Sequence, residues 1–215
     1  MSDAGEETLW HSRLADFREA TASAQPTPGG GSVAGVSAAL GVGLLIMALE
    51  ISVKRKDAVL PENARELIAE ARRLMALLSA GADGDILAFR GYMTALQLPK
   101  ATDAEKALRR EKLQSATRQA TESPLQTARH ILDALRLAGK AVPLTHTHVV
   151  SDVAAGASLL EGALKAVLFN VDINLPSLAD AGLRAAWGEE RAGLARHSAE
   201  VAAEVLRAIS ARLAA

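Results

Sequence analysis

Residues 29–49 read GGGSVAGVSAALGVGLLIMAL, an uncharged stretch of 21 residues in which glycine and alanine are interspersed with branched apolar side chains. An apolar helix needs about 20 residues to cross a bilayer, so the length alone would allow a membrane span. However, the stretch begins with three glycines, stops at Glu50 and has no comparable second segment elsewhere in the chain. We therefore predict a buried helix of a soluble protein and no association with a membrane.

Small residues recur along one face of this predicted helix. Gly31, Gly35, Ala39 and Gly43 are spaced four residues apart, which places them on the same side of a helix. A face without bulky side chains allows another helix backbone to approach to van der Waals contact. Such a seam suits either a deeply buried central helix or a dimer interface. Because an uncharged helix needs covering on every side, we predict a homodimer.

The composition supports a helical protein and excludes several classes of function. Hydrophobic residues make up 49% of the chain but aromatic residues only 3%, which favours closely packed helices over a β-sandwich. The 24 Lys and Arg residues are balanced by 25 Asp and Glu residues, so no overall basic field is present for nucleic acid. Without cysteine the chain has no disulfide framework, thiolate nucleophile or cysteine-based zinc site. The charged N-terminus lacks the apolar core of a signal peptide, and we expect a cytoplasmic protein.

Helix-starting and helix-stopping residues divide the rest of the chain into amphipathic segments. Pro61 occupies a typical first helical position, and Thr102 with Glu105 has the form of a capping box. Ser123-Pro124 repeats that form and marks either a fresh start or a sharp kink. The expected helices cover about 6–23, 32–56, 61–98, 103–139, 150–170 and 178–213. The sequence thus predicts a single all-α domain over residues 1–215, an orthogonal or up-down bundle of long helices around an Ala/Gly-rich buried central helix.

The segment PTPGGGS at residues 26–32 is the most unusual local feature. Consecutive glycines that lead into a helix present free N–H groups at the positive end of the helix dipole, which suits an anionic or carbonyl-bearing ligand. The segment lacks the Gly-Lys-Ser/Thr of a P-loop, and no strand precedes it as in a dinucleotide-binding fold. A flexible turn between two helices would have the same composition.

Charged and titratable side chains form three further clusters. The run Lys54-Arg55-Lys56 ends the apolar helix, where it serves either as a cationic helix cap or as a site for carboxylates of a ligand. Asp83 and Asp85 flank a glycine within an apolar segment, either as caps or as functional carboxylates. His146 and His148 have no further ligand cluster beside them, so we predict no metal site.

Polar residues stand at both ends of the predicted helix over 150–170. Asp152, after Ser151, is either an N-terminal cap or a functional carboxylate. Asn170 and Asn174 are four residues apart and would share a helix face. Because an amide in an apolar setting needs partners, these two side chains either tie down the backbone or hold a polar ligand.

Together these motifs resemble the cyclodeaminase/cyclohydrolase family of folate enzymes. The family includes the cyclodeaminase part of formiminotransferase-cyclodeaminase and bacterial methenyltetrahydrofolate cyclohydrolases. The similar stretches, in the family's order and spacing across about residues 20–175, are PTPGGGS at 26–32, DILAF at 85–89, LPK at 98–100, TESPL at 121–125, SD at 151–152 and NVDIN at 170–174.

Two stretches depart from the family pattern. Members read like NLTIGKKKY where this chain has ALEISVKRK at 48–56, and they tend to have GNxN where it has THTH at 145–148. Both departures fall where a polar contact with folate is expected. They favour an alternative in which the chain is a non-catalytic folate-binding or structural helical dimer that retains the family scaffold.

The resemblance implies an enzyme that acts on a C–N bond of a tetrahydrofolate. One reaction cyclises 5-formimidoyltetrahydrofolate to the 5,10-methenyl form and releases ammonia; the other hydrolyses the methenyl form to 10-formyltetrahydrofolate. Both pass through a tetrahedral carbon between two nitrogens, so both need a proton shuttle and stabilisation of an amidinium-like cation. A carboxylate serves both needs.

The resemblance also implies roles for individual residues. Asp152 or Asp85 is the expected catalytic carboxylate, while Asn170 and Asn174 orient the pterin. The remaining residues expected to bind substrate are Pro28, Gly29, Gly30, Gly31, Ser32, Lys54, Arg55 and Ser151, with the two cations attracting the glutamate tail. The expected partners are a folate and a second copy of the chain, without nucleic acid, membrane, metal or any other cofactor.

Overall fold

The computed structural model describes residues 8–55 and 63–214, and these ranges contain six α-helices and no strand. The helices are α1 Leu14–Thr21, α2 Gly30–Val53, α3 Ala64–Leu96, α4 Asp103–Ala141, α5 Val150–Asn174 and α6 Ala181–Leu213. Short 3-10 turns at Leu9–His11, Val142–Leu144, Thr147–Val149 and Leu175–Ser177 connect or precede them. The predicted all-α class is confirmed.

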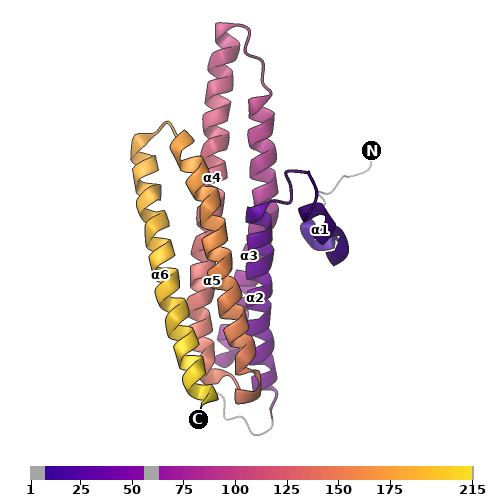
Figure 1. Cartoon of the computed structure of the whole chain (residues 1–215), viewed down its shortest axis with the longest axis vertical. Coiled ribbons are helices and arrows are strands. Elements are labelled where there is room, and N and C mark those ends of the chain that lie inside the picture. The colour runs from indigo at the N-terminus through magenta and orange to yellow at the C-terminus, as the bar shows by residue number, and fades with distance from the viewer. Residues whose placement is uncertain (1–7, 56–62, 215) are drawn as a thin grey trace.

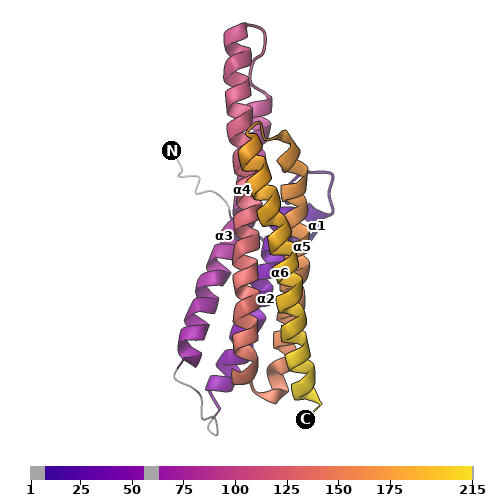
Figure 2. The same cartoon turned by 90° about the vertical axis from the view of Figure 1, so that its left-hand side faces the viewer.

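The long helices run along one axis and alternate in direction (Figure 1). Helix α2 packs between α3 and α5, and α4 contacts both α3 and α5, which closes a ring of four helices. Helix α6 covers α4 and α5. The ends of α3 and α4 project beyond the other helices, and α1 stands beside the bundle (Figures 1 and 2). The up-down alternative therefore describes this bundle, and the orthogonal one does not.

Helix α2 is the Ala/Gly-rich central helix that the sequence predicts. Its inward side chains, among them Val42, Leu45 and Leu49, are fully buried. It is long and apolar enough to span a membrane, but 61% of its most apolar window is buried inside the bundle. Its outward face is uncovered in one copy of the chain, where Leu40 is 56% exposed and Met47 40% exposed. Other parts of the bundle therefore cover α2, as the sequence predicts, on every side except this face.

Several expected helix boundaries change. The first helix begins at Leu14 rather than near residue 6, and α3 runs without interruption. Helix α4 continues through Pro124, so of the two alternatives at this proline, a fresh start or a kink, the fresh start is wrong. Buried neighbours such as Leu125 and Ala128 fix this segment in the core, and their packing outweighs the lost backbone hydrogen bond. The capping box at Thr102 is confirmed. Pro61 and Lys56 lie outside the described residues.

Glycines create two close helix contacts around α2. A Cβ atom at Gly35 would lie 2.9 Å from the Cβ atom of Ala82 on α3. A Cβ atom at Gly156 of α5 would lie 2.7 Å from the carbonyl oxygen of Gly41 on α2. The small-residue seam is thus confirmed at Gly35, whereas Gly43 has no atom within 4 Å of such a Cβ position.

We expect Gly156→Val to lower the free energy of unfolding by about 2 kcal/mol, because the new side chain must push α5 away from the backbone of α2. Gly188→Val on α6 is the matched control, since no atom lies within 4 Å of its Cβ position. Urea denaturation of both variants measures the difference. Equal stability of the two variants would show that the α2–α5 contact is not tight.

Two consecutive residues attach α6 to the bundle. Glu190 accepts hydrogen bonds from Arg129 of α4, with Nη2 2.8 Å from Oε2. Arg191 donates to Asp172 of α5, with distances of 2.7 and 2.6 Å. The hydrogen bonds from Arg129 lower the pKa of Glu190. This ion pair therefore stabilises the fold above the ordinary glutamate pKa and ceases to do so as the pH falls through the lowered value.

We expect Glu190→Gln to reduce the free energy of unfolding by about 1 kcal/mol at pH 7, a value typical of a partly exposed pair. The difference from the wild type should shrink as the pH falls below about 4.3, where an unpaired glutamate becomes protonated. Denaturation curves between pH 7 and 3.5 measure it, with Glu204→Gln on the same helix as control. A difference that does not vary with pH would contradict the electrostatic origin.

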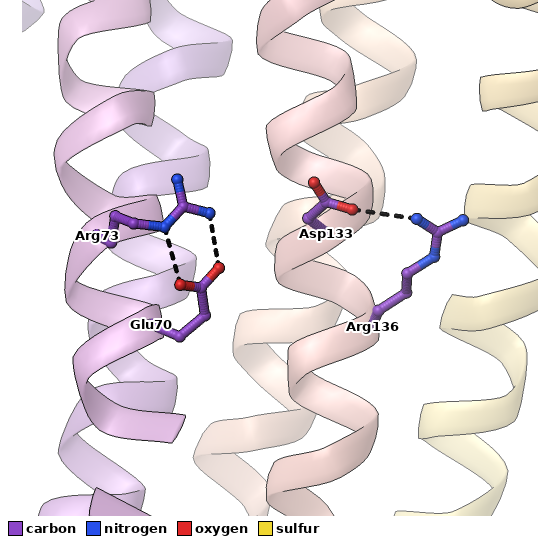
Figure 3. A network of polar contacts seen from close by, with 4 residues as sticks. All are labelled: Glu70, Arg73, Asp133 and Arg136. Carbon is purple, nitrogen blue, oxygen red and sulfur yellow. Dashed lines mark hydrogen bonds and ion pairs between the residues drawn. The ribbon is translucent and has the colours of Figure 1, made fainter. Parts of the chain in front are cut away.

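Two further charged pairs each lie within a single helix. Glu70 and Arg73 pair on α3, and Asp133 and Arg136 pair on α4 (Figure 3). Each pair is separated by three residues and more than two-fifths exposed. Such pairs contribute about 0.2–0.5 kcal/mol each to a helix. These side chains therefore support α3 and α4 locally, and Glu70, Asp133 and Arg136 also line a small cavity of about 180 Å³ between the two helices.

Candidate active site

A cavity of about 440 Å³ opens where α2 begins. The turn before α2, the C-terminal third of α3, the middle of α4 and the last turn of α5 surround it. Its lining comprises Pro26, Thr27, Gly29, Gly30, Gly31, Asp85, Ala88, Phe89, Tyr92, Ala120, Pro124, Asn170, Ile173, Asn174 and Ser177. The cavity thus combines an apolar wall with one carboxylate, two amides and exposed backbone.

Asp85 joins three helices at the wall of this cavity. The backbone N–H and the hydroxyl of Ser32 donate to its Oδ2 at 3.0 and 2.9 Å. Asn170 of α5 approaches its Oδ1, with Nδ2 at 3.4 Å. The carboxylate therefore caps the N-terminus of α2 although it lies within α3. Its orientation is fixed by Ser32, and Oδ1 remains on the side of Asn170 and the cavity.

The two neighbouring aspartates have different partners. Asp83 accepts hydrogen bonds from the Thr8 hydroxyl at 2.7 Å and from the Leu9 backbone at 2.8 Å. It thereby attaches the N-terminal segment to α3 and does not line the cavity. Both aspartates act as caps, as one interpretation of the sequence predicted, but each caps a segment other than its own helix. Of the two, only Asp85 can also reach a ligand in this cavity.

The glycine turn makes room for this carboxylate. A Cβ atom at Gly31 would lie 2.1 Å from Asp85 Oδ1 and 2.3 Å from Asn170 Nδ2, so no side chain fits there. Gly29 is the N-cap of α2. The N–H of Ser32 is taken by Asp85, which leaves fewer donors for a ligand than the sequence suggested. The N–H groups of Gly30 and Gly31 make no hydrogen bond to the described residues and line the cavity.

The two asparagines share a face of α5, as predicted, and both line the cavity. Asn174 donates through Nδ2 to the carbonyl oxygens of Ala120 and Asn170, each at 2.9 Å. This amide therefore holds α5 against α4. Asn170, in contrast, contacts the carboxylate of Asp85 directly, so the two amides have different surroundings.

The structure adds aromatic residues that the site prediction omitted. Phe89 and Tyr92 follow Asp85 at four and seven residues, a spacing that places all three on one face of α3. Both aromatic side chains line the cavity, and Tyr92 is the only tyrosine of the chain. The helical spacing was visible in the sequence and could have indicated both. Aromatic walls with a few polar groups are typical of small-molecule sites.

Of the remaining predicted residues, Pro28 lines a neighbouring cavity of about 280 Å³. The other four lie at the opposite end of the bundle. Lys54 is the C-cap of α2, beside Arg55, and Ser151 and Asp152 are in the first turn of α5. Asp152 precedes Asn170 by 18 residues, which is about 27 Å along a helix. One copy of the chain therefore does not bring Asp152, Lys54 or Arg55 to the cavity that contains Asp85.

Asp152 is not the cap that one interpretation expected. The N-cap of α5 is Val149, and no side chain caps this end. Asp152 is partly exposed and makes no hydrogen bond or ion pair with the described residues. Nearby, the backbone N–H of His146 donates to Ser52 Oγ at 2.8 Å, and His146 Nδ1 accepts from the backbone of His148 at 3.2 Å. Within residues 8–55 and 63–214 no three metal-binding side chains gather.

Comparisons with known proteins agree with the motifs. The family model described as formiminotransferase-cyclodeaminase matches residues 13–192. A methenyltetrahydrofolate cyclohydrolase of Methylorubrum extorquens is 32% identical over 189 residues, which cover 87% of this chain and 86% of that protein. A formimidoyltransferase-cyclodeaminase of Sus scrofa is 31% identical over 210 residues, 97% of this chain but only 39% of that longer protein.

A solved structure shares the fold. The crystal structure of a formiminotetrahydrofolate cyclodeaminase from Thermotoga maritima superposes with a TM-score of 0.83. The match covers 94% of this chain and 98% of the other at 22% sequence identity. The helical bundle is therefore one that a known cyclodeaminase also adopts.

Proposed function

The chain belongs to the formiminotransferase-cyclodeaminase family, and from this premise we propose that it acts on the C–N bonds of a tetrahydrofolate one-carbon unit. The reaction is either hydrolysis of 5,10-methenyltetrahydrofolate to the 10-formyl form or cyclisation of 5-formimidoyltetrahydrofolate with loss of ammonia. The cyclohydrolase relative matches over most of its own length, so hydrolysis is the reaction to test first.

The observation that carries this proposal is the single carboxylate in the cavity. Asp85 is held by Ser32 and Asn170 beside an aromatic wall, where a flat pterin would fit. A fixed negative charge favours the cationic one-carbon unit of the methenyl form, because a preorganised carboxylate needs no reorganisation during the reaction. The amide of Asn170 can also donate a hydrogen bond to a ring substituent.

In the hydrolysis, Asp85 accepts a proton from water as the water oxygen bonds to the methenyl carbon. The tetrahedral adduct then loses its hydroxyl proton, the bond from carbon to N5 breaks, and N5 takes up a proton. The net reaction consumes one water and releases one proton. In the cyclisation, N10 attacks the formimidoyl carbon and loses its proton, while the departing nitrogen is protonated and leaves as ammonia. One carboxylate can serve as proton acceptor and donor in both reactions.

We further propose that the enzyme needs no cofactor, works in the cytoplasm and functions as a homodimer. Proton transfer and cation stabilisation are tasks of side chains alone, so neither reaction requires a metal or a redox group. The absence of cysteine is compatible with a reducing compartment. The uncovered apolar face of α2 supports the homodimer.

The test follows the ultraviolet absorbance of the methenyl group. Purified wild-type protein should accelerate the loss of this absorbance from 5,10-methenyltetrahydrofolate in proportion to enzyme concentration, or generate it from the 5-formimidoyl substrate. Buffer without protein provides the uncatalysed rate. If neither absorbance change exceeds this rate, the chain is a non-catalytic member that retains the family scaffold.

A further inference from the structure

One side of the bundle carries an uncovered apolar face. On α2, Leu40 and Met47 are seven residues apart and both exposed, and Lys54 follows after seven more. On α5, Leu159 and Ile173 are 43% and 75% exposed. A spacing of seven residues is close to two helical turns, so each row keeps to one side of its helix. We call the surface formed by these two rows the α2–α5 face.

The α2–α5 face connects the two separated groups of predicted site residues. At one end Ile173 belongs both to the face and to the lining of the Asp85 cavity. At the other end the α2 row finishes at Lys54, and the α5 row begins at Asp152, which is seven residues before Leu159. The face therefore runs from the cavity to the cationic end of the bundle.

The cavity by itself lacks a group that a folate needs. Among its lining residues the only ionisable carboxylate is Asp85, and none is Lys, Arg or His. A folate carries carboxylates on its glutamate tail, which bind most strongly to cationic side chains. In one copy of the chain the cations at Lys54 and Arg55 are about 36 Å from the start of α2, the length of a 24-residue helix. The site is thus incomplete for the proposed substrate.

We propose that a second copy of the chain covers the α2–α5 face in the opposite direction, so that the partner's Lys54 lies at the mouth of the Asp85 cavity and binds the glutamate tail. This inference rests on the proposed function for the identity of the ligand. The arrangement of the two copies does not depend on the proposed function.

The heights of the residues along the bundle fit this arrangement. Leu40 and Leu159 lie at the same level, since a Cβ atom at the adjacent Gly41 would be 3.4 Å from Leu159 Cβ. Ile173 is 14 residues from Leu159 in one direction, and Lys54 is 14 residues from Leu40 in the other. Each of these separations of 14 residues is about 21 Å along the helix axis. A twofold axis through Leu40 and Leu159 therefore brings the partner's Lys54 to the level of Ile173 and of the cavity.

A second copy suits this face better than another occupant. An interface with a twofold axis joins the same patch on both chains, so apolar residues near the axis contact apolar residues of the partner. The α2–α5 face has Leu40 and Leu159 at its centre, a cavity with the carboxylate of Asp85 at one end, and Lys54 with Asp152 at the other. When the two copies run in opposite directions, the cavity end of each copy lies beside the Lys54 end of the other, so this pairing occurs twice in the dimer. Two copies in the same direction would bring Lys54 next to the partner's Lys54.

The arrangement can be tested without any activity, because the chain has no cysteine and single cysteines can be introduced cleanly. The wild type should sediment as a dimer. A short bismaleimide should link Ile173→Cys to Lys54→Cys when the two variants are mixed, and should link Leu159→Cys to itself. A monomeric wild type, or Ile173→Cys linked efficiently to itself, would overturn the proposal.

The shared site is tested by mixing two impaired variants. Lys54→Glu should raise KM at least tenfold with little change in kcat, while Asp85→Asn should lower kcat by at least about 10²-fold. Equal amounts that exchange at random form half mixed dimers, and each mixed dimer has one cavity with both Asp85 and the partner's Lys54 intact. The mixture, assayed far below KM, should therefore recover about a quarter of the wild-type rate.

The outcomes separate this inference from the proposed function. If the activity of the mixture is only that of its Lys54→Glu component, both residues act within one copy and the inference is wrong. If the wild type itself has no turnover, the proposed function fails, and the cross-linking result still decides how the two copies are arranged. An unchanged KM in Lys54→Glu would show that Lys54 does not bind the substrate.

Discussion

Asp85→Asn is expected to lower kcat by about 10²–10⁴-fold with a much smaller change in KM, the range typical of a lost acid–base group. This loss corresponds to about 3–5 kcal/mol of transition-state stabilisation. The asparagine oxygen can still accept a hydrogen bond from Ser32, so the N-terminus of α2 stays capped and the fold is retained. Steady-state kinetics with the methenyl substrate, together with thermal unfolding, measure both parts of the prediction.

The matched control is Asp83→Asn. Asp83 is two residues away on the same helix and bonds Thr8 and Leu9 instead of lining the cavity. This variant should lose some stability but keep the wild-type kcat. Near-normal turnover of Asp85→Asn would remove Asp85 from the mechanism and leave Asp152 as the remaining carboxylate of the sequence prediction.

Gly31→Ala is expected to reduce kcat/KM by at least about 10²-fold. The added methyl group would lie 2.1 Å from Asp85 Oδ1 and 2.3 Å from Asn170 Nδ2, so both side chains must move. A displacement of about 1 Å in a catalytic group can cost a factor of this size. Both displaced side chains line the cavity and can turn into it, so the loss of stability should be limited to about 1–3 kcal/mol.

The control for this prediction is Gly91→Ala on α3. No atom lies within 4 Å of a Cβ position at Gly91, and the residue is exposed, so activity should be unchanged. Kinetics and urea denaturation of both variants separate a local disturbance of Asp85 from a general loss of folding. Full activity of Gly31→Ala would mean that the orientation of Asp85 in the wild type is not needed for catalysis.

The sequence was sufficient to predict the helices because their signals are local. Apolar periodicity, the capping box at Thr102 and the uncharged stretch before Glu50 each depend on neighbours within a few residues. At Pro124 the sequence leaves a fresh start and a kink open, because the place of this proline within α4 depends on burial against other helices. Local rules do not include that contribution to the free energy.

The candidate site was predicted as a set of residues but not as an arrangement. Asp85 and Asp152 were equal candidates in the sequence, since spacing along the chain does not reveal where on the bundle a residue lies. The structure places Asp85 beside Gly31 and Asn170, whereas Asp152 lies about 27 Å away along α5. Similarly, Tyr92 lies outside the family motifs; its spacing from Asp85 indicates a shared helix face, and the packing of α3 shows that this face lines the cavity.

The structure also shows where the departures from the family sequence pattern lie. Residues 48–55 and 145–148 lie at the end of the bundle remote from the Asp85 cavity, where Ser52 Oγ accepts a hydrogen bond from the backbone of His146. They leave the residues around Asp85 unaltered within one copy. Under the proposed dimer they would instead affect the part of the site that the partner contributes.

The most direct measurement is a crystal structure of the protein with a stable reduced folate such as 5-formyltetrahydrofolate. We expect a pterin in the cavity within hydrogen-bond distance of Asp85 or Asn170, and a glutamate tail that extends past Ile173 toward the partner's Lys54. A folate bound beside Asp152 and Lys54 of a single copy, with an empty Asp85 cavity, would contradict this expectation.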